Sequence, residues 1–410
     1  MNVLFLSQIV PYPPHGGVLQ RGYNIIRELG GRANVHLLAF VHPDVLPTSQ
    51  AIDESRAALG AFCQQIDYFP LWPKRSAAHR AAGLAASALS HQPFSAVAHR
   101  SAAFGASVRS AMAATRFDVL HVDTIALSQF VEPRSTVPAV LTHHNIESIL
   151  MERRAQVEPG AAARLFLARE ARKLAEYERR IAPTVAVNIV VSATDQAALC
   201  ERVPGVRTAI VRNGVDIAYF QPSDTPEQHA LIYTGGMNMF ANKDAVLYFL
   251  DQVWPAIRAS VPDVRFFAVG QDPPPELAAI ATRDSSVVMT GYVDDIRPYV
   301  RQAAVYVVPL RVGGGTRLKV LDAMASGKAL VSTSIGCEGI DVVPGVHLLT
   351  ADTPETFAAE TVALLHDQSR RRVLGAAARQ LVEDKYAWRV VGDQLMTTYA
   401  AAIDTVGAGR

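Results

Sequence analysis

The chain has 410 residues, of which 50% are hydrophobic and 19% charged, and its formal net charge is +1. This length predicts two or three domains, and the composition is typical of globular rather than disordered or fibrous proteins. A net charge close to zero argues against a protein that coats nucleic acid, and we expect no nucleic-acid partner.

The cysteines and the amino terminus indicate a cytoplasmic protein. Cys63, Cys200 and Cys337 lack the spacing of a metal or redox motif, which favours a reducing compartment. The apolar run over residues 3–6 follows no basic segment and soon breaks at Gln8, so it predicts a β-strand rather than a signal peptide. No stretch approaches the roughly 18–20 apolar residues of a transmembrane helix, and we expect any membrane contact to be peripheral, at the inner face of the cytoplasmic membrane.

The first half of the chain alternates short apolar runs with amphipathic segments. The run over residues 3–6 leads into a loop rich in proline and glycine, which includes Gly16 and Gly17, and then into a helical pattern. Further elements are predicted as strands at 35–41, 118–122, 139–142 and 188–192 and as a charged helix at 161–180. This alternation predicts a parallel, doubly wound sheet.

The same alternation begins again in the second half. A turn at Asn213-Gly214 and a polar stretch at 221–226 predict a linker between two α/β domains of similar size. Strands are predicted at residues 209–212, 230–234, 265–269, 287–290, 305–308 and 329–332. Ligands of open α/β sheets bind beyond the carboxyl ends of the strands, so two such domains facing each other predict a ligand-binding cleft.

The segment after the predicted strand at 305–308 carries the most informative motif. Three consecutive glycines, 313–315, precede a helix predicted from about Thr316 to Ser326, with Thr316 as its cap. Glycines let the backbone approach a ligand closely, and a helix amino terminus attracts anions. Three cations stand in the same segment, Arg311, Arg317 and Lys319. The combination predicts a diphosphate site, and the segment matches neither a P-loop nor a Gly-x-Gly-x-x-Gly motif.

The segment from Pro309 to Ala325, Pro-Leu-Arg-Val-Gly-Gly-Gly-Thr-Arg-Leu-Lys-Val-Leu-Asp-Ala-Met-Ala, resembles the carboxy-terminal signature of retaining glycosyltransferase family 4. It is similar in particular to a Gly-Gly-Gly-Thr-Arg branch that resembles exopolysaccharide-associated sugar transferases. Further motifs extend the resemblance over nearly the whole chain: Asn213-Gly-Val-Asp216 with Phe220, Gly291-Tyr-Val-Asp-Asp-Ile-Arg-Pro298, Gly336-Cys-Glu-Gly-Ile340 and Gly345-Val-His-Leu-Leu349. The family has the GT-B fold, in which two Rossmann-like, doubly wound domains face each other across a cleft.

The resemblance implies transfer of a hexose from a uridine or guanosine diphosphate donor to an acceptor hydroxyl, with retention of configuration and without a metal or other cofactor. It implies that residues 1–212 form an acceptor domain, that 213–385 form a donor domain, and that 386–410 form a helix crossing back to the first. The implied acceptor is a glycan or a lipid-linked molecule in bacterial polysaccharide or glycoconjugate assembly. Two alternatives stay open, a sugar-nucleotide epimerase and a non-catalytic sugar-nucleotide-binding protein of the same fold.

In the first domain the resemblance assigns roles to residues that follow two of the strands. Gly16 and Gly17 match a glycine pair that packs under the donor pyrophosphate, and His144 matches a catalytic histidine near the sugar. The sequence leaves open whether His143 or His144 faces the site, because neighbours on an extended chain point in opposite directions. Further candidates are His121, Asp123 and Glu147.

In the second domain the resemblance assigns the donor diphosphate to the loop after the first strand. Gly236 lies in this loop, and Lys243 matches a lysine that holds the diphosphate. Met237 stands where the family has an arginine. The missing charge is therefore expected from Arg317 or Lys319.

The glycine-rich segment departs from the family pattern in its acidic residues. Asp322 replaces the second of two family glutamates and is expected to accept a ribose hydroxyl, and Gly314 stands in the place of the first. The backbone N–H groups of Gly313, Gly314 and Gly315, beside Thr316, are expected to take over part of that contact.

A basic stretch in the first domain suggests an anionic partner. Residues 68–117 contain no acidic side chain, and their cations are Lys74, Arg75, Arg80, Arg100, Arg109 and Arg116. The stretch predicts contact with a lipid-linked or anionic glycan acceptor or with an anionic membrane surface, and a solvated basic face is the alternative.

Overall fold

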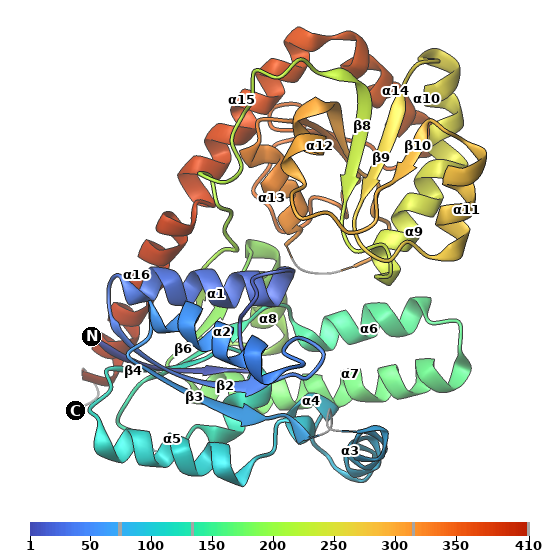
Figure 1. Ribbon diagram of the computed structural model, residues 1–410. Helices are drawn as coiled ribbons and strands as arrows, with labels where there is room; N and C mark the ends of the chain where they lie inside the picture. The colour runs from blue at the N-terminus through green and yellow to red at the C-terminus, as the bar shows by residue number, and fades with distance from the viewer. Residues whose placement is uncertain (73–75, 133–134, 314–315, 408–410) are drawn as a thin grey trace. The chain divides into compact units, whose positions relative to one another are not determined.

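The chain folds into two compact units, and the computed structural model describes residues 1–72, 76–132, 135–313 and 316–407 (Figure 1). The first unit comprises Met1–Arg212 and Trp388–Arg410, and the second comprises Asn213–Ala387. The carboxy-terminal helix α16 (Trp388–Gly407) belongs to the first unit. Tyr386, where the sequence predicted this last segment to begin, is fully buried in the core of the second unit.

The described part of the first unit holds a parallel sheet with the order β3-β2-β1-β4-β5-β6-β7. Its strands are β1 (Asn2–Ser7), β2 (Asn34–Val41), β3 (Gln65–Pro70), β4 (Val119–Val122), β5 (Ala139–His143), β6 (Val187–Val190) and β7 (Thr208–Ile210). Its other helices are α1 (Gly17–Gly30), α2 (Ser49–Gly60), α3 (Ala77–Leu89), α4 (Phe94–Ala98), α5 (Ala102–Ala114), η2 (Ile125–Phe130), α6 (Glu147–Val157), α7 (Ala161–Ile181), η3 (Ala182–Thr184) and α8 (Ala193–Arg202). The predicted parallel α/β organisation of this half is confirmed.

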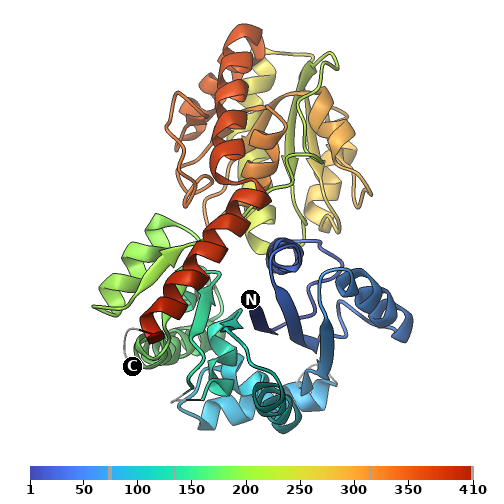
Figure 2. The same cartoon turned by 90° about the vertical axis from the view of Figure 1, so that its left-hand side faces the viewer.

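Alternation along β1 places apolar side chains on both faces of the first sheet. Val3 and Phe5 pack into a core with α1, α2 and α16, whereas Leu4 and Leu6 pack into a second core with α5 and η2. Helix α16 contacts α1, β4 and β5 and so completes the first of these cores (Figure 2). Helices α6 and α7 lie side by side as an antiparallel pair (Figure 1).

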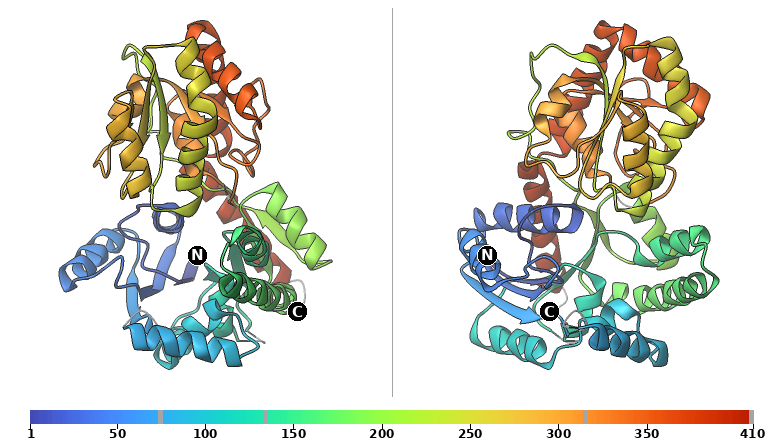
Figure 3. Two further views of the ribbon diagram at one scale, coloured as in Figure 1. Left: turned by 90° about the vertical axis from the view of Figure 1, so that its right-hand side faces the viewer. Right: turned by 45° about the vertical axis from the view of Figure 1, so that its right-hand side comes forward.

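The described part of the second unit holds a parallel sheet with the order β10-β9-β8-β11-β12-β13. Its strands are β8 (Gln228–Thr234), β9 (Arg265–Val269), β10 (Val287–Met289), β11 (Ala303–Val308), β12 (Ala329–Ser332) and β13 (Leu349–Thr350). Its helices are α9 (Phe240–Tyr248), the π-helical turn η4 (Phe249–Val253), α10 (Trp254–Ser260), α11 (Pro275–Arg283), α12 (Arg297–Gln302), α13 (Leu318–Ala325), α14 (Pro354–His366) and α15 (Gln368–Lys385). Helices pack on both faces of this sheet around one large apolar core (Figure 3).

Polar caps define where many of the helices begin. Among the described residues, six such side chains accept a backbone N–H from the first turn of the following helix: Thr48, Ser76, Ser101, Ser192, Thr353 and Asp367. Helix α13 differs, because it begins at Leu318 after Arg317, which makes no side-chain cap bond. The prediction that Thr316 caps this helix was wrong. Within the described ranges, no helix is long and apolar enough to cross a bilayer.

Candidate active site

Ligand sites in parallel α/β sheets form at the carboxyl ends of the strands, at the point where the strand order reverses. In the first unit this point lies between β1 and β4, and in the second between β8 and β11. The segments after β1, β8 and β11 contain the predicted glycine residues Gly16, Gly236 and Gly313. Each unit therefore has its own candidate site at one edge of its sheet.

Close backbone packing shapes the end of β8 in the second unit. Gly235 has a φ of +145°, which favours glycine, and a Cβ at this position would lie 2.7 Å from Lys319 Nζ. A Cβ on Gly270 would lie 1.9 Å from the carbonyl oxygen of Gly235. The predicted donor residue Gly236 follows directly, in the turn that leads into α9. Glycine at positions 235 and 270 therefore lets the backbone after β8 pack closely against the segment after β9, beside the amine of Lys319.

Lys319, in the first turn of α13, is held by two neutral side chains. Its Nζ donates to Tyr233 Oη and to Asn242 Oδ1, both at 2.7 Å, and lies 4.0 Å from the centre of the Tyr233 ring. Desolvation lowers the pKa of Lys319 well below its ordinary value, and the charge of Arg317 lowers it further. Among the described residues no carboxylate is hydrogen-bonded to Lys319 Nζ, although the charge of Asp322 raises its pKa, and an incoming anion would stabilise the charged amine further.

Asp322 lies one turn after Lys319 on α13. Desolvation raises its pKa to about 7, and the charge of Lys319 opposes that shift. Among the described residues, neither its buried Oδ1 nor the buried Oγ1 of Thr316 has a hydrogen-bond partner. Two polar atoms near the start of α13 are therefore left for groups outside the described protein.

The glycine-rich loop is described up to Gly313. This residue has a φ of +132°, and a Cβ on it would lie 3.1 Å from Arg317 Nη2, so Arg317 folds back beside the loop. Gly314 and Gly315, both predicted to bind the donor, lie outside the described residues.

The other cations predicted at this site have neighbours of their own. Arg311 forms a two-point ion pair with Asp244, at 3.1 and 2.5 Å, and its guanidinium lies 4.6 Å from the centre of the Tyr248 ring. Lys243 forms an ion pair with Glu276 on α11 at the surface. Lys319 and Arg317 are thus the cations that lie beside the glycine turns.

Burial of position 237 is the physical reason why methionine suits it better than the arginine expected from the family resemblance. The Met237 side chain is fully buried in the apolar core of the second unit. An unpaired guanidinium in that environment would carry a large desolvation cost. The charge for this site must therefore come from other residues.

His144 lies at the carboxyl edge of the first sheet, directly after β5. Its Nε2 is 3.3 Å from Asp123 Oδ1, which follows β4, and the Asp123 side chain is only 4% exposed. The preceding residue, His143, is buried on β5 and pairs through Nε2 with Asn188 Oδ1 at 3.0 Å. Burial lowers the pKa of His143 to about 4. The structure thus directs His143 into the sheet and His144 toward Asp123.

A buried network connects Asp123 to the last helix. Tyr399 Oη on α16 is hydrogen-bonded to His121 Nδ1 at 2.7 Å, and burial lowers the pKa of His121 to about 3, so its ring stays neutral. Arg21 on α1 donates to the carbonyls of residues 211 and 212, and burial lowers its pKa to about 10 against the opposing charge of Asp123. Arg21, on α1, therefore places a positive charge near Asp123.

Glu147 opens α6 close to His144. Burial raises the pKa of its carboxyl, while a hydrogen bond of 3.1 Å from Thr124 and the charge of His144 lower it. At the amino end of α1, Gly16 has a φ of +87°, and a Cβ on either Gly16 or Gly17 would meet no described atom within 4 Å. The first turn of α1 therefore has open space beside it.

Comparisons with known proteins decide the family. A family model described as Glycosyltransferase Family 4 matches residues 15–219, and one described as Glycosyl transferases group 1 matches residues 228–367. The chain belongs to glycosyltransferase family 4.

Curated relatives and solved structures agree with this assignment. The chain is 26% identical over 298 residues to a phosphatidyl-myo-inositol mannosyltransferase of Mycolicibacterium smegmatis, covering 69% of this chain and 71% of the relative. Its fold is similar to that of sucrose-phosphate synthase from Thermosynechococcus elongatus, with a TM-score of 0.69 at 16% identity over 99% of this chain and 100% of that one. It is also similar to Anabaena HepE in complex with UDP and glucose, with a TM-score of 0.65 at 16% identity over 98% and 100% of the two chains. These similarities establish the GT-B fold for this glycosyltransferase.

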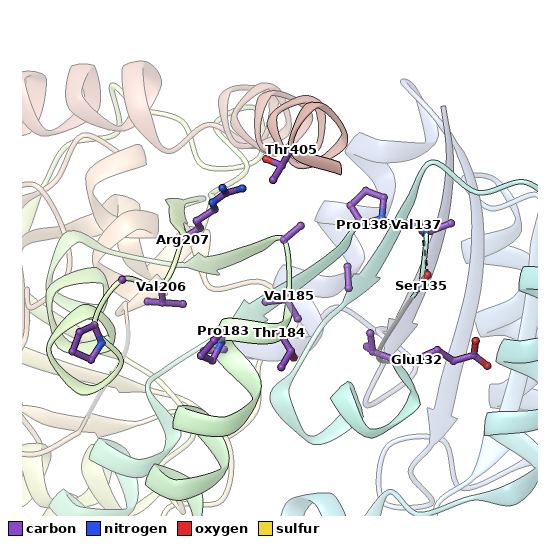
Figure 4. A pocket seen from close by; sticks show the side chains of 16 residues that line it. Glu132, Ser135, Val137, Pro138, Pro183, Thr184, Val185, Val206, Arg207 and Thr405 are labelled. Carbon is purple, nitrogen blue, oxygen red and sulfur yellow. Dashed lines mark hydrogen bonds between the residues drawn. The ribbon is translucent and has the colours of Figure 1, made fainter. Parts of the chain in front are cut away.

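A separate cavity of about 410 Å³ lies at the opposite, amino-terminal edge of the first sheet (Figure 4). Its walls come from the residues that precede β5, β6 and β7 and from Thr405 on α16. No residue that the sequence predicted for the site lines it. Among the described residues, no three His, Cys, Asp or Glu side chains are grouped so that they could hold a metal ion.

Sequence reasoning missed the residues that hold the predicted ones in place. Tyr233 and Asn242 are 86 and 77 positions from Lys319, and Tyr399 is 278 positions from His121. Tyrosine and asparagine at such distances give no local pattern, so only the fold brings these side chains together.

Proposed function

We propose that this glycosyltransferase moves a hexose from a nucleoside diphosphate donor to an acceptor hydroxyl, with retention of configuration and without a metal cofactor. The observation that carries the proposal is Lys319, a desolvated cation with neutral partners beside the glycine turn at the β8–β11 edge. The similarity in fold to HepE, which was solved in complex with UDP and glucose, supports a uridine or a related nucleotide as the donor.

The diphosphate binds over the glycine turns of the second unit. Lys319 and Arg317 provide charge there, and the backbone N–H groups of Gly236 and of the loop that begins at Gly313 provide dipoles. Fixed dipoles and cations of this kind stabilise the negative charge that develops on a leaving diphosphate. Lys243 adds a third cation by leaving Glu276, because a surface ion pair contributes little stability and exchanges partners at low cost.

The sugar and nucleoside parts of the donor use the remaining polar groups. Asp322 accepts a hydrogen bond from a ribose hydroxyl, which gives its Oδ1 the partner it lacks among the described residues. In the first unit, Gly16 and Gly17 leave space for the pyrophosphate at the start of α1. His144 acts at the sugar during transfer.

The product of the reaction distinguishes this function from its alternatives. The purified protein is incubated with a panel of UDP- and GDP-hexoses, and the nucleotide products are separated by chromatography. Release of nucleoside diphosphate supports transfer. A changed sugar that remains on its nucleotide would indicate an epimerase, and tight binding with neither product would indicate a non-catalytic binding protein.

The acceptor in this proposal is a lipid-linked or anionic glycan of bacterial polysaccharide or glycoconjugate assembly, met at the inner face of the cytoplasmic membrane. An exposed surface on α3 and α7 supports membrane contact. Leu89 is 90% exposed and Leu165 is 72% exposed, and Arg169 joins their helices by donating to the carbonyl of Ala88 at 2.6 Å. Exposed apolar side chains beside arginine fit an anionic bilayer.

Sedimentation with liposomes tests this membrane contact. We expect vesicles that contain phosphatidylglycerol to bind the protein and neutral vesicles to bind it weakly. The substitution Leu165→Glu should abolish binding, whereas Val373→Glu, at a residue that is 67% exposed on α15 of the second unit, should not. Equal loss in both variants, or binding that does not depend on lipid charge, would contradict the assignment.

A further inference from the structure

The side chain of Asn242 joins two parts of the second site that are far apart in the sequence. Its Oδ1 accepts from Lys319 Nζ at 2.7 Å, and its Nδ2 donates to the carbonyl of Gly236 at 2.9 Å. Asn242 lies in the first turn of α9, where side chains point back toward the amino end of the helix and so toward this glycine turn. One amide therefore contacts both the Lys319 amine and the backbone after β8.

A third side chain closes this arrangement into a triangle. Tyr233 Oη on β8 accepts from Lys319 at 2.7 Å and donates to Asn242 Oδ1 at 2.6 Å. The opposite orientation of the amide would turn its N–H groups toward an ammonium and its oxygen toward a carbonyl, and both contacts are repulsive. The three side chains thus fix the orientation of the amide and the position of the amine.

Two N–H donors beside this triangle have no acceptor among the described residues. A lysine ammonium has three donors, and within the described ranges Lys319 uses two of them, both inside the triangle. In the turn after β8, the N–H groups on either side of Gly236 donate to the carbonyls of Val269 and Gln271, whereas that of Gly236 has no described acceptor. One ammonium proton and one backbone N–H therefore remain for an anion.

We infer that Asn242 is a positioning residue of the donor site, which holds the Lys319 amine and the Gly236 N–H beside each other for one phosphate of the donor. This inference rests on the proposed binding of a nucleoside diphosphate to the second unit. Glycine at position 235 allows the close approach, because a Cβ there would lie 2.7 Å from Lys319 Nζ and 2.8 Å from Asn242 Nδ2. A neutral amide holds the amine without neutralising it, whereas a carboxylate in its place would compete with the phosphate for the same charge.

The charged and titratable groups around the Lys319 amine leave it able to respond to a ligand. Desolvation lowers its pKa well below the ordinary value, the charge of Arg317 lowers it further, and Asp322 on the same helix raises it. Tyr233 on β8 and Tyr306 on β11 have pKa values raised by burial, so both are neutral at physiological pH. A diphosphate that reaches the amine therefore raises its pKa and binds with proton uptake.

Isothermal titration with UDP and GDP, in buffers of different ionisation enthalpy, tests the inference. Asn242→Ala should weaken binding of the preferred nucleotide by about 10-fold or more, because the hydrogen bonds that hold the site are lost and one of them is to a charged amine. Asn242→Asp, which is isosteric, should weaken binding as well and should remove most of the proton uptake, since the new carboxylate keeps the amine charged before the nucleotide arrives. Loss of a structural contact alone would leave the uptake unchanged.

Asn238 in the same turn gives the matched control. It is exposed and donates from Nδ2 to Asp272 at 3.2 Å, so Asn238→Ala should leave both affinity and proton uptake unchanged. In a Lys319→Met background, Asn242→Ala should cost at most about 2-fold in further affinity, because Asn242 acts chiefly through the amine. Additive losses, or an equal loss in Asn238→Ala, would overturn the inference.

Thermal unfolding shows whether each variant folds, and Tyr233→Phe provides a milder change, since it removes only the hydroxyl that bonds Asn242 and Lys319. This variant should weaken nucleotide binding by about 5-fold, and only where Lys319 is present. A folded Tyr233→Phe protein that binds as tightly as the wild type would contradict the inference. The expected coupling in a protein that releases no nucleoside diphosphate from a nucleotide sugar would uphold Asn242 and overturn the transferase function alone. Binding of neither nucleotide to the wild type would overturn both.

Discussion

The two sheet edges place opposite charges at comparable positions. In the second unit, the cation Lys319 is held by Tyr233 and Asn242 and has no carboxylate bonded to it within the described residues. In the first unit, the anion Asp123 lies between His144 and Arg21. An edge whose cation is bonded only to neutral side chains is prepared for an anionic ligand, whereas an edge that already contains its own anion is prepared for a neutral hydroxyl. This difference supports donor phosphate in the second unit and acceptor or sugar hydroxyls in the first.

We expect the largest effect from removing the cationic side chain of Lys319 in the second unit. Lys319→Met should lower kcat/KM for the donor by about 100-fold or more, because preorganised groups on a leaving group contribute that much. Steady-state kinetics with the preferred nucleotide sugar measure the loss. The control is Lys328→Met, at another buried lysine, which precedes β12 and donates to Glu227 and to the carbonyls of Arg301 and Ala303. The control should reduce stability but not donor affinity, and equal kinetic losses would refute the special role of Lys319.

The second prediction concerns His144, at the edge of the first sheet that we assign to sugar or acceptor hydroxyls. His144→Ala should lower kcat by about 100-fold with little change in donor affinity, as expected for loss of a group that acts in the transition state. Single-turnover measurements with bound donor separate the two quantities. His229→Ala, at a histidine that is 50% exposed and pairs with Asp263, serves as the control. A variant that loses donor affinity instead of rate would assign His144 to the donor site.

A smaller effect is expected at Lys243. Lys243→Ala should raise the donor KM by about 10-fold, because a charge-assisted hydrogen bond contributes about 1.5 kcal/mol. Glu276→Gln, which frees Lys243 from its surface ion pair, should leave the donor KM unchanged or lower it. Unchanged donor affinity in Lys243→Ala would remove this residue from the site.

The smallest expected effect is on the pH dependence of stability, through Asp322 in the second unit. The pKa of Asp322 is raised to about 7 in the folded protein, so the unfolded state releases this proton first and stability falls as pH rises from about 4 to about 7. Asp322→Asn removes this dependence and should stabilise the protein by about 1–2 kcal/mol above pH 7, but not near pH 4. Denaturant unfolding at several pH values measures the difference. A gain that does not depend on pH would show that burial of charge is not its cause.

The sequence predicted the fold where apolar runs are fully buried. The strands at 265–269 and 329–332 begin and end as predicted, because every residue after the first is inaccessible or nearly so in both. Strand β3 (Gln65–Pro70) was missed, since it lies at the sheet edge and its side chains are half-buried or exposed. The two-residue strand β13 has too few residues to give a periodic signal.

The candidate site was predictable in part for a similar reason. Lys319 and His144 could be selected because they stand next to glycines or strand ends in the sequence. The burial of Met237 and the pairing of Arg311 with Asp244 depend on packing between helices and strands that are distant in the sequence. Neighbouring sequence contains no information on those contacts.

The central claim is that the second unit binds a nucleoside diphosphate at Lys319. Isothermal titration of UDP and GDP, repeated between pH 7 and 9 in buffers of different ionisation enthalpy, measures both affinity and the protons exchanged. We predict that one nucleotide binds with proton uptake, because the lowered pKa of Lys319 rises when a diphosphate reaches its amine. We also predict that Lys319→Met abolishes this uptake and most of the affinity. Binding of the same strength and proton stoichiometry in both proteins would contradict the claim.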